Sequence, residues 1–268
     1  MVALASWPGI AGRLLRTSVL VTVVYRAQLF VWLVSGVAPL FMMMIWWELS
    51  RDKVIGGYAP SDFVAYFLGI YLVRQLTAVW VIFVLNDEIR QGTLSGRLLK
   101  PVAPFWFHVA EHLGQMVVRA PIVITVFCVG ASLFAIDLAA VAWRLPLFLV
   151  SLVLAWIIIF HIYYCVGLLA FWMANSLALD AMVWSMYTVL GGMLIPVDLF
   201  PEATRHLVAL LPFSASLDFP VKVLIGKAAD GGDLLQGFAV QLFWVVLLVG
   251  LRRGLWRQGL KRFSGAGI

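Results

Sequence analysis

Charged side chains are scarce in this 268-residue sequence. Asp, Glu, Lys and Arg together make up 12% of it, whereas hydrophobic residues make up 63%. A soluble domain is typically about a quarter charged and about 45–50% apolar, so this composition excludes an ordinary soluble protein. The apolar residues run on for twenty or more positions, as in LFVWLVSGVAPLFMMMIWWEL, instead of alternating with polar ones. This pattern predicts helical membrane spans and not a β-barrel.

Motifs for nucleotide binding and for hydrolytic catalysis are missing. The stretch LIGKAA around Gly226 and Lys227 lacks the upstream glycine and the hydroxyl residue of a phosphate-binding P-loop, and no G-x-S-x-G nucleophile elbow occurs. We therefore expect no ATP site, no catalytic site and no bound cofactor on this chain. Work against a gradient would need energy from a partner protein or from an ion.

Residues of the kinds that bind metals are also few. Cys128 and Cys165 are the two cysteines, and both fall inside apolar runs, where we interpret them as small core residues. The strongest metal-like pattern is HVAEH, in which His108, Glu111 and His112 could place two imidazoles on zinc with a carboxylate as base. No third ligand is apparent, and the same residues would form the polar face of an interfacial helix. We predict no metal site.

Six apolar runs are long enough to cross about 30 Å of hydrocarbon at 1.5 Å per residue. We place them near residues 28–48, 62–85, 113–135, 145–172, 177–197 and 234–251. The boundary between the fourth and fifth runs, at Asn175 and Ser176, is the least distinct. We predict that residues 1–268 form a single all-α integral membrane domain with six transmembrane helices.

The distribution of basic residues predicts the orientation of these spans. Most of the 19 Lys and Arg residues fall in segments on the same side as the N-terminus, and cytoplasmic loops carry the excess of positive charge. Both termini are therefore predicted to be cytoplasmic. The net charge of +6 fits a basic inner face against anionic membrane lipid, so it requires no nucleic acid.

Three segments outside the spans have distinctive patterns. Residues 7–18 predict an amphipathic helix on the inner membrane surface, although a basic extension of the first span is an alternative. Segment 198–230, on the outer side, is too apolar for a solvated loop and is interrupted by Pro212 and Pro220, so we predict two short re-entrant helices. Residues 253–268 predict a basic cytoplasmic tail.

Arg74 and Gln75 lie near the middle of the second predicted span. An unpaired arginine there costs at least about 2.5–3.5 kcal/mol, so we expect Arg74 to face the protein interior or a wet cavity. It either lines a pathway or contacts a substrate, or it forms a structural pair with an acid such as Glu111 or Asp180. Arg119 lies in the longer third run, where we expect it to sit near the inner interface and extend toward water.

The fourth predicted span carries polar aromatic residues in its inner half. His161 and Tyr164 are candidates for lining a pathway through the membrane. The alternative is that they pack and form hydrogen bonds between helices, which is the more common role of single polar aromatics in a span.

Two motifs at their expected positions along the chain point to a family. NDEIRQGTLSGRLLKPV at 86–102, between the second and third spans, is similar to the pattern E-I-x-x-G-x-L-x-x-x-L-x-x-P. GGMLIPVDLFPEATRHLVALLPF at 191–213 is similar to G-x-x-x-P-x-x-x-F-P followed by L-P. The chain resembles the ABC type-2 exporter permeases, in particular a bacterial branch whose members work with a second permease.

The resemblance implies roles for the segments. The N-terminal surface helix would be a connecting helix, and residues 86–100 would form a coupling helix that seats on the ATPase. The residues that either match the motif or supply candidate docking charges are Asp87, Glu88, Ile89, Arg90, Gly92, Leu94, Arg97 and Lys100. The outer segment would close the pathway, with Pro196, Phe200, Pro201 and Pro212 as candidate gate residues.

The resemblance also implies partners and a location. The chain would assemble with two copies of a separate ATP-binding protein, which hold the ATP and magnesium, and with a second permease of the same or similar sequence. It would lie in the bacterial cytoplasmic membrane and export a drug, lipid or glycan. Two other functions stay open: an ion-coupled secondary transporter that uses Arg74 with a buried acid, and a zinc hydrolase at His108, Glu111 and His112.

Overall fold

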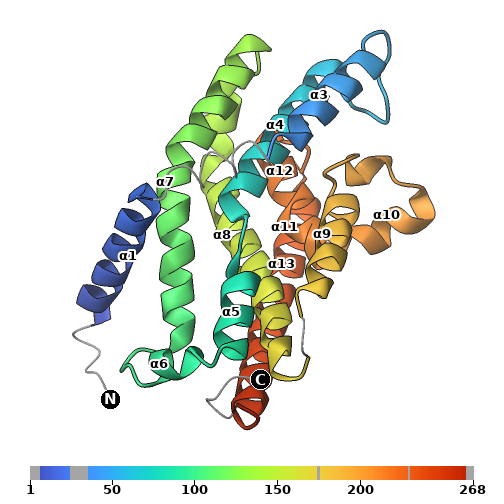
Figure 1. Ribbon diagram of the computed structural model, residues 1–268. Helices are drawn as coiled ribbons and strands as arrows, with labels where there is room; N and C mark the ends of the chain where they lie inside the picture. Colours follow the sequence, from blue (N-terminus) through green and yellow to red (C-terminus); the bar gives the residue numbers. More distant parts are fainter. Residues whose placement is uncertain (1–6, 25–35, 174–175, 229, 264–268) are drawn as a thin grey trace.

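The computed structural model describes residues 7–24, 36–173, 176–228 and 230–263. In these ranges the chain is helical, with an isolated β-bridge between Ile55 and Tyr58 and no strand. The helices, in chain order, are α1 (Trp7–Val24), α3 (Ala38–Leu49), α4 (Pro60–Thr77), α5 (Val81–Arg90), α6 (Leu94–Leu98), α7 (Pro104–Leu133), α8 (Leu138–Leu168), η2 (Leu169–Phe171), α9 (Ala178–Leu190), η3 (Val197–Leu199), α10 (Glu202–Ala209), α11 (Pro212–Ser216), α12 (Asp218–Ile225) and α13 (Gly231–Leu260). The long helices run side by side as one bundle (Figure 1).

Four stretches of the described chain are long and apolar enough to cross a membrane. They are Pro60–Arg90, which joins α4 to α5, Pro104–Leu133, Val141–Phe171 and Gly231–Leu260. These stretches identify an all-helical multi-pass membrane protein. The predicted count of six spans stays a prediction.

The other two predicted spans correspond to short helices. The first, near 28–48, begins in residues 25–35, outside the described ranges, and the part described is α3. The fifth was predicted to extend to residue 197, but α9 has 13 residues and ends at Leu190. The chain turns there because Gly192 adopts a left-handed conformation with φ +85°.

The span Pro60–Arg90 is the central element of the bundle. Nearly every residue of α4 from Phe63 onward is buried, whereas α13 is largely exposed. The predicted span near 62–85 falls within this stretch, but the sequence did not predict that its helix is interrupted. The helix stops at Thr77 and restarts at Val81, with Ala78 in an extended conformation (φ −59°, ψ 124°).

Helix α1 lies alongside α7 in Figure 1 and is longer than the predicted 7–18. The two helices approach closely at Gly114, where an added Cβ would meet backbone atoms of Ser18 and Val19 at 2.8 and 2.9 Å. A small residue at a helix crossing allows such close backbone contact in membranes. The amphipathic pattern of this segment predicted a surface helix, but it did not predict the contact with α7.

The segment predicted to hold two re-entrant helices contains three short helices and the turn η3. Helix α10 lies at the periphery, whereas α11 and α12 lie inside the bundle (Figure 1). Helix α12 packs against α4 and α8. The predicted tail at 253–268 begins inside α13, which stays helical to Leu260, and residues 264–268 lie outside the described ranges.

Candidate functional site

The predicted coupling segment at 86–100 divides into two helices joined by a tight turn. Helix α5 extends to Arg90, and α6 begins at Leu94. The turn depends on Gly92, which is buried and has φ +73°. Only glycine adopts this left-handed conformation without a steric cost. Figure 1 places this turn at the end of the bundle where α13 also ends, which we term the α6 end.

Charged residues of the coupling segment bind to α7. Glu88 accepts a hydrogen bond from Arg97 Nε at 2.6 Å and another from His108 Nε2 at 3.0 Å. Arg97 Nη2 also contacts Glu111 Oε1 at 2.9 Å. The Tyr164 hydroxyl of α8 donates to His108 Nδ1 at 3.4 Å. We term these five residues the Glu88 network.

This network accounts for the zinc-like pattern. His108 and Glu111 bind Glu88 and Arg97, whereas His112 stacks on Trp156 with ring centroids 5.7 Å apart. The three residues of HVAEH therefore have different partners. Within the described ranges no group of three or more His, Cys, Asp or Glu residues is placed to hold a metal ion.

The remaining residues of the segment divide into an inner and an outer face. Ile89 and Leu94 are fully buried, and Asn86 donates to Ser176 Oγ at 2.6 Å. The exposed residues are Asp87, Arg90, Gln91, Thr93, Gly96, Leu98, Leu99 and Lys100, and Leu99 is 89% exposed. The segment thus presents one free surface that combines charge with an exposed leucine, and its opposite surface is fixed to the bundle. Arg97, a predicted docking charge, and Glu88, which matches the motif, belong to the fixed side.

Gly92→Ala is expected to destabilise the turn because an alanine at positive φ costs about 1–2 kcal/mol. The melting temperature of the purified protein in detergent should fall by several degrees, since about 1 kcal/mol corresponds to about 2–4 °C for chains of this size class. Gly96→Ala is the matched control, because Gly96 lies in α6 with nothing within 4 Å of an added Cβ. Equal melting temperatures for the two variants would contradict the role assigned to Gly92.

A second charged cluster fixes α12 to α4 at the opposite end of the bundle. Lys222 of α12 binds Asp198 Oδ1 at 2.6 Å and Asp218 Oδ2 at 2.8 Å. The Tyr58 hydroxyl donates to Asp198 at 2.7 Å, and the Tyr66 hydroxyl of α4 donates to Asp218 at 2.7 Å. Burial, and then the neighbouring Asp198 carboxylate, raise the pKa of Tyr58 far above its ordinary value, so its hydroxyl stays a donor. We term these five residues the Lys222 network.

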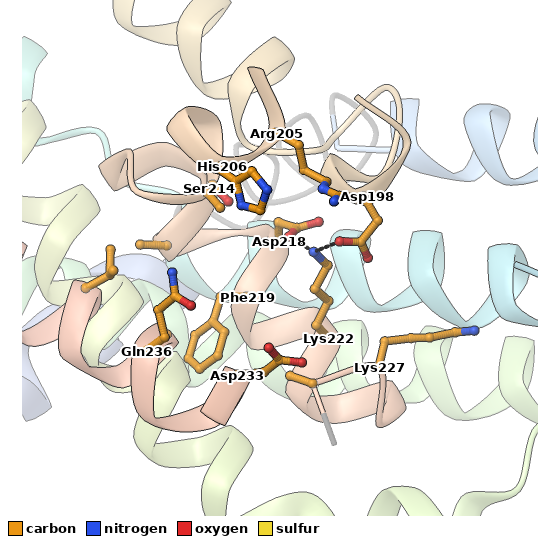
Figure 2. A pocket seen from close by; sticks show the side chains of 15 residues that line it. Asp198, Arg205, His206, Ser214, Asp218, Phe219, Lys222, Lys227, Asp233 and Gln236 are labelled. Carbon is orange, nitrogen blue, oxygen red and sulfur yellow. Dashed lines mark hydrogen bonds and ion pairs between the residues drawn. The ribbon is translucent and has the colours of Figure 1, made fainter. Parts of the chain in front are cut away.

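This network borders a pocket of about 310 Å³ that is open to the surface. Figure 2 shows the Lys222 ammonium between Asp198 and Asp218, with Arg205 and His206 of α10 on one side of the pocket. A second lysine, Lys227, ties the same segment to the start of α4 through Asp62 at 2.8 Å. Sequence reasoning missed both lysines because Asp198 lies 24 residues away from Lys222, and Asp62 lies 165 residues away from Lys227.

The predicted gate residues lie around the Lys222 network. Pro196 is buried directly before η3, and Pro212 is buried at the start of α11. Phe200 is half-buried, and Pro201 is exposed before α10. Whether these residues open and close a pathway stays a prediction.

The predicted pathway residues do not lie together. Tyr164 belongs to the Glu88 network, and His161 Nδ1 donates to the Ile157 carbonyl of its own helix at 2.7 Å. Arg74 and Gln75 lie one turn before the interruption between α4 and α5 and are both buried.

Arg74 is not paired with either of the acids considered from sequence. Its guanidinium lies 4.8 Å from the ring centre of Trp184, and Glu111 pairs with Arg97. The expectation that Arg119 extends toward water was wrong. Arg119 is 1% exposed, and its Nη2 donates to the carbonyl of Ala78 at 3.2 Å, which is a carbonyl left free where α4 ends.

Comparison with known proteins agrees with this architecture. The profile of the family described as "ABC-2 family transporter protein" matches residues 34–267, which is most of the chain. A search of curated proteins found no significant match. The match confirms the resemblance drawn from the two sequence motifs, so the chain belongs to the ABC-2 transporter family and is a transmembrane permease of a kind that associates with an ATP-binding subunit.

Proposed function

We propose that this chain is the transmembrane half of an ATP-driven exporter for hydrophobic or amphipathic molecules. A separate ATP-binding protein in two copies would hold ATP and magnesium, and a second permease of the same or similar sequence would complete the pathway. The complex would lie in the bacterial cytoplasmic membrane with the α6 end and both termini in the cytoplasm. Permeases of this family are transport subunits and generally not enzymes.

The continuity of the interrupted helix α4–α5 supports this proposal most strongly. At one end Glu88 of α5 binds Arg97 and His108, and at the other end Tyr66 of α4 binds Asp218. One buried helical element therefore connects the coupling segment to the segment beside the pocket. A movement of α6 driven by an ATPase would be transmitted through α5 to α4, with the interruption at Ala78 as the place where the two halves can change their angle.

The alternative functions find less support. Ion-coupled transport was proposed to use Arg74 with a buried acid, but the ion pairs formed among the described residues do not include Arg74. The residues of the zinc hypothesis are engaged in the Glu88 network and in stacking. No observation favours a second function over the exporter.

Substitutions on the exposed face of the coupling segment test whether an ATP-binding protein docks there. Arg90→Glu and Leu99→Asp are expected to reduce the amount of ATP-binding protein that co-purifies with the tagged chain at least about tenfold, because a buried contact energy of 1.4 kcal/mol corresponds to a factor of ten. Arg51→Glu is the control, since Arg51 is an exposed arginine directly after α3, and Figure 1 shows α3 at the end of the bundle away from α6. If all three variants retained equal amounts of the ATP-binding protein, its docking surface would lie elsewhere on the chain.

A further inference from the structure

Three basic or amide side chains lie at the level of the central span where α4 ends and α5 begins. Arg74 and Gln75 come from the last turn of α4, and Arg119 reaches the same place from α7 through its bond to the Ala78 carbonyl. We term these three residues the break site. It lies near the midpoint of the stretch Pro60–Arg90, at the depth where charge is most costly in a membrane.

Several donors of the break site have no acceptor. Arg74 is 9% exposed, Gln75 is 2% exposed and Arg119 is 1% exposed. Nevertheless Nε and Nη1 of Arg74, Nε2 of Gln75 and Nε of Arg119 find no hydrogen-bond partner among the described residues. Every one of these unsatisfied atoms is an N–H donor. Buried polar groups in proteins are nearly always hydrogen-bonded, so such a cluster requires an explanation.

The positive charge of the break site is likewise uncompensated. All 13 acidic residues of the sequence lie within the described ranges, so no acid is hidden in the remaining segments. None of the ion pairs formed there includes Arg74 or Arg119. The negative end of the α4 dipole and the positive end of the α5 dipole both face this place, because α4 ends at Thr77 and α5 begins at Val81, so the helix dipoles largely offset each other there.

The nearest aromatic surface lies beside Arg74. Trp184 of α9 contacts the Arg74 guanidinium through its ring face at 4.8 Å and stays 39% exposed. A cation over an indole ring is stabilised, but the ring accepts no strong hydrogen bond from the remaining N–H groups. The site therefore combines unused donors with an adjacent, partly open apolar surface.

We propose that the break site binds the anionic group of an amphipathic cargo, such as a phosphate or a carboxylate, while the apolar part of the cargo lies against Trp184. The planar guanidinium is suited to bidentate contact with such groups. An anion would supply acceptors to the unused N–H groups of Arg74 and Arg119 and would neutralise their charge, whereas the Gln75 amide lies against Gly36. This inference rests on the proposed export function, to which it adds a charge requirement for the cargo.

The test compares probes that share a tail and differ in charge. Binding of decyl phosphate, decanoate and decyltrimethylammonium to the full chain, purified in dodecyl maltoside, is measured by native mass spectrometry with calorimetry as a second method. We expect the two anions to bind at least about tenfold more tightly than the cation. The difference between phosphate and carboxylate identifies the preferred group, and inorganic phosphate alone should bind much more weakly because it lacks the tail.

Two substitutions assign this binding to the site. Arg74→Gln and Arg119→Gln are each expected to weaken anion binding at least about tenfold, whereas Arg74→Lys should retain part of it. Arg51→Gln removes an exposed arginine and should bind like the parent. If Arg119→Gln fails to fold because the Ala78 carbonyl loses its partner, Arg74→Gln decides, since Nε and Nη1 of Arg74 donate to no acceptor among the described residues.

Equal binding of all three probes to the parent, or unchanged anion binding in Arg74→Gln, would overturn the proposal. The binding measurement requires no ATPase, so its outcome is separate from that of the exporter proposal. Loss of ATP-binding protein from every preparation would contradict the exporter, whereas charge-independent binding with the ATPase still attached would contradict the break site alone.

Discussion

Glu88→Gln is expected to weaken communication between the ATPase and the outer segment while leaving ATP hydrolysis nearly unchanged. The substitution removes the carboxylate charge that accepts from Arg97 at 2.6 Å and from His108 at 3.0 Å. A hydrogen bond to a charged group contributes about 1.5–3 kcal/mol. Because about 1.4 kcal/mol is a factor of ten in an equilibrium, the coupling segment should lose its fixed position on α7 at least about tenfold more often.

The measurement requires no knowledge of the cargo. A cysteine replaces Leu207 of α10, which is 67% exposed, in a chain whose exposed Cys128 has been changed to serine. The rate of maleimide labelling at position 207 is compared with and without ATP in the complete complex. The parent should show an ATP-dependent change in this rate, and this change should be clearly smaller in Glu88→Gln because the segment leaves its position on α7 more often.

The adjacent acid provides the control. Asp87 is exposed and makes none of the contacts of the Glu88 network, so Asp87→Asn should label like the parent. Arg97→Gln removes the bond between Arg97 and Glu88 by changing its donor. This variant replaces Glu88→Gln in the measurement if Glu88→Gln does not accumulate in the membrane. Equal ATP-dependent labelling in Glu88→Gln and Asp87→Asn would show that the network has no part in transmission.

The sequence predicted the long elements because hydrophobic length is a local property. The apolar runs of α7, α8 and α13 are each long enough to specify a membrane helix without tertiary information. The sequence did not predict the interruption at Ala78, because the interruption is not marked by a local property of the sequence. No proline or glycine marks it, and the Ala78 carbonyl is satisfied by Arg119, 41 residues away along the chain. Tertiary contact determined the break.

The site residues also divide into those that a local motif reveals and those whose role depends on distant partners. Gly92 was identified by its motif, and its positive φ supplies the physical reason for a glycine there. Glu88 matched the same motif but was assigned to docking, because the sequence did not indicate that His108 and Arg97 would meet it. Lys222 was not selected at all. A lysine in a predicted outer loop has no local sign of burial, and Asp198 reaches it only after η3 and α11 have folded back.

Lys222→Met is expected to produce the largest loss of stability among these substitutions. The change leaves Asp218, which is 2% exposed, beside Asp198 with no cation between them. Breaking a buried pair from one side costs about 3–5 kcal/mol, so the melting temperature in detergent should fall by about 10 °C. Arg51→Met, which removes an exposed partner of Glu48, should shift it by no more than about 2–4 °C because exposed pairs contribute about 0–1 kcal/mol.

The pH dependence distinguishes this explanation from a simple packing defect. Burial alone lowers the pKa of Lys222, but Asp218 and Asp198 more than offset this and raise it above the ordinary 10.5. When the pKa of a group is higher in the folded protein than in the unfolded chain, the group stabilises the folded protein fully at pH values below its unfolded pKa. This stabilisation is lost as the pH rises through the pKa of the folded state. The difference between the parent and Lys222→Met should therefore be constant from about pH 6 to 9 and shrink only in strong alkali. Adding Asp218→Asn to Lys222→Met should recover part of the loss, because the uncompensated buried charge is removed; no recovery would assign the loss to packing.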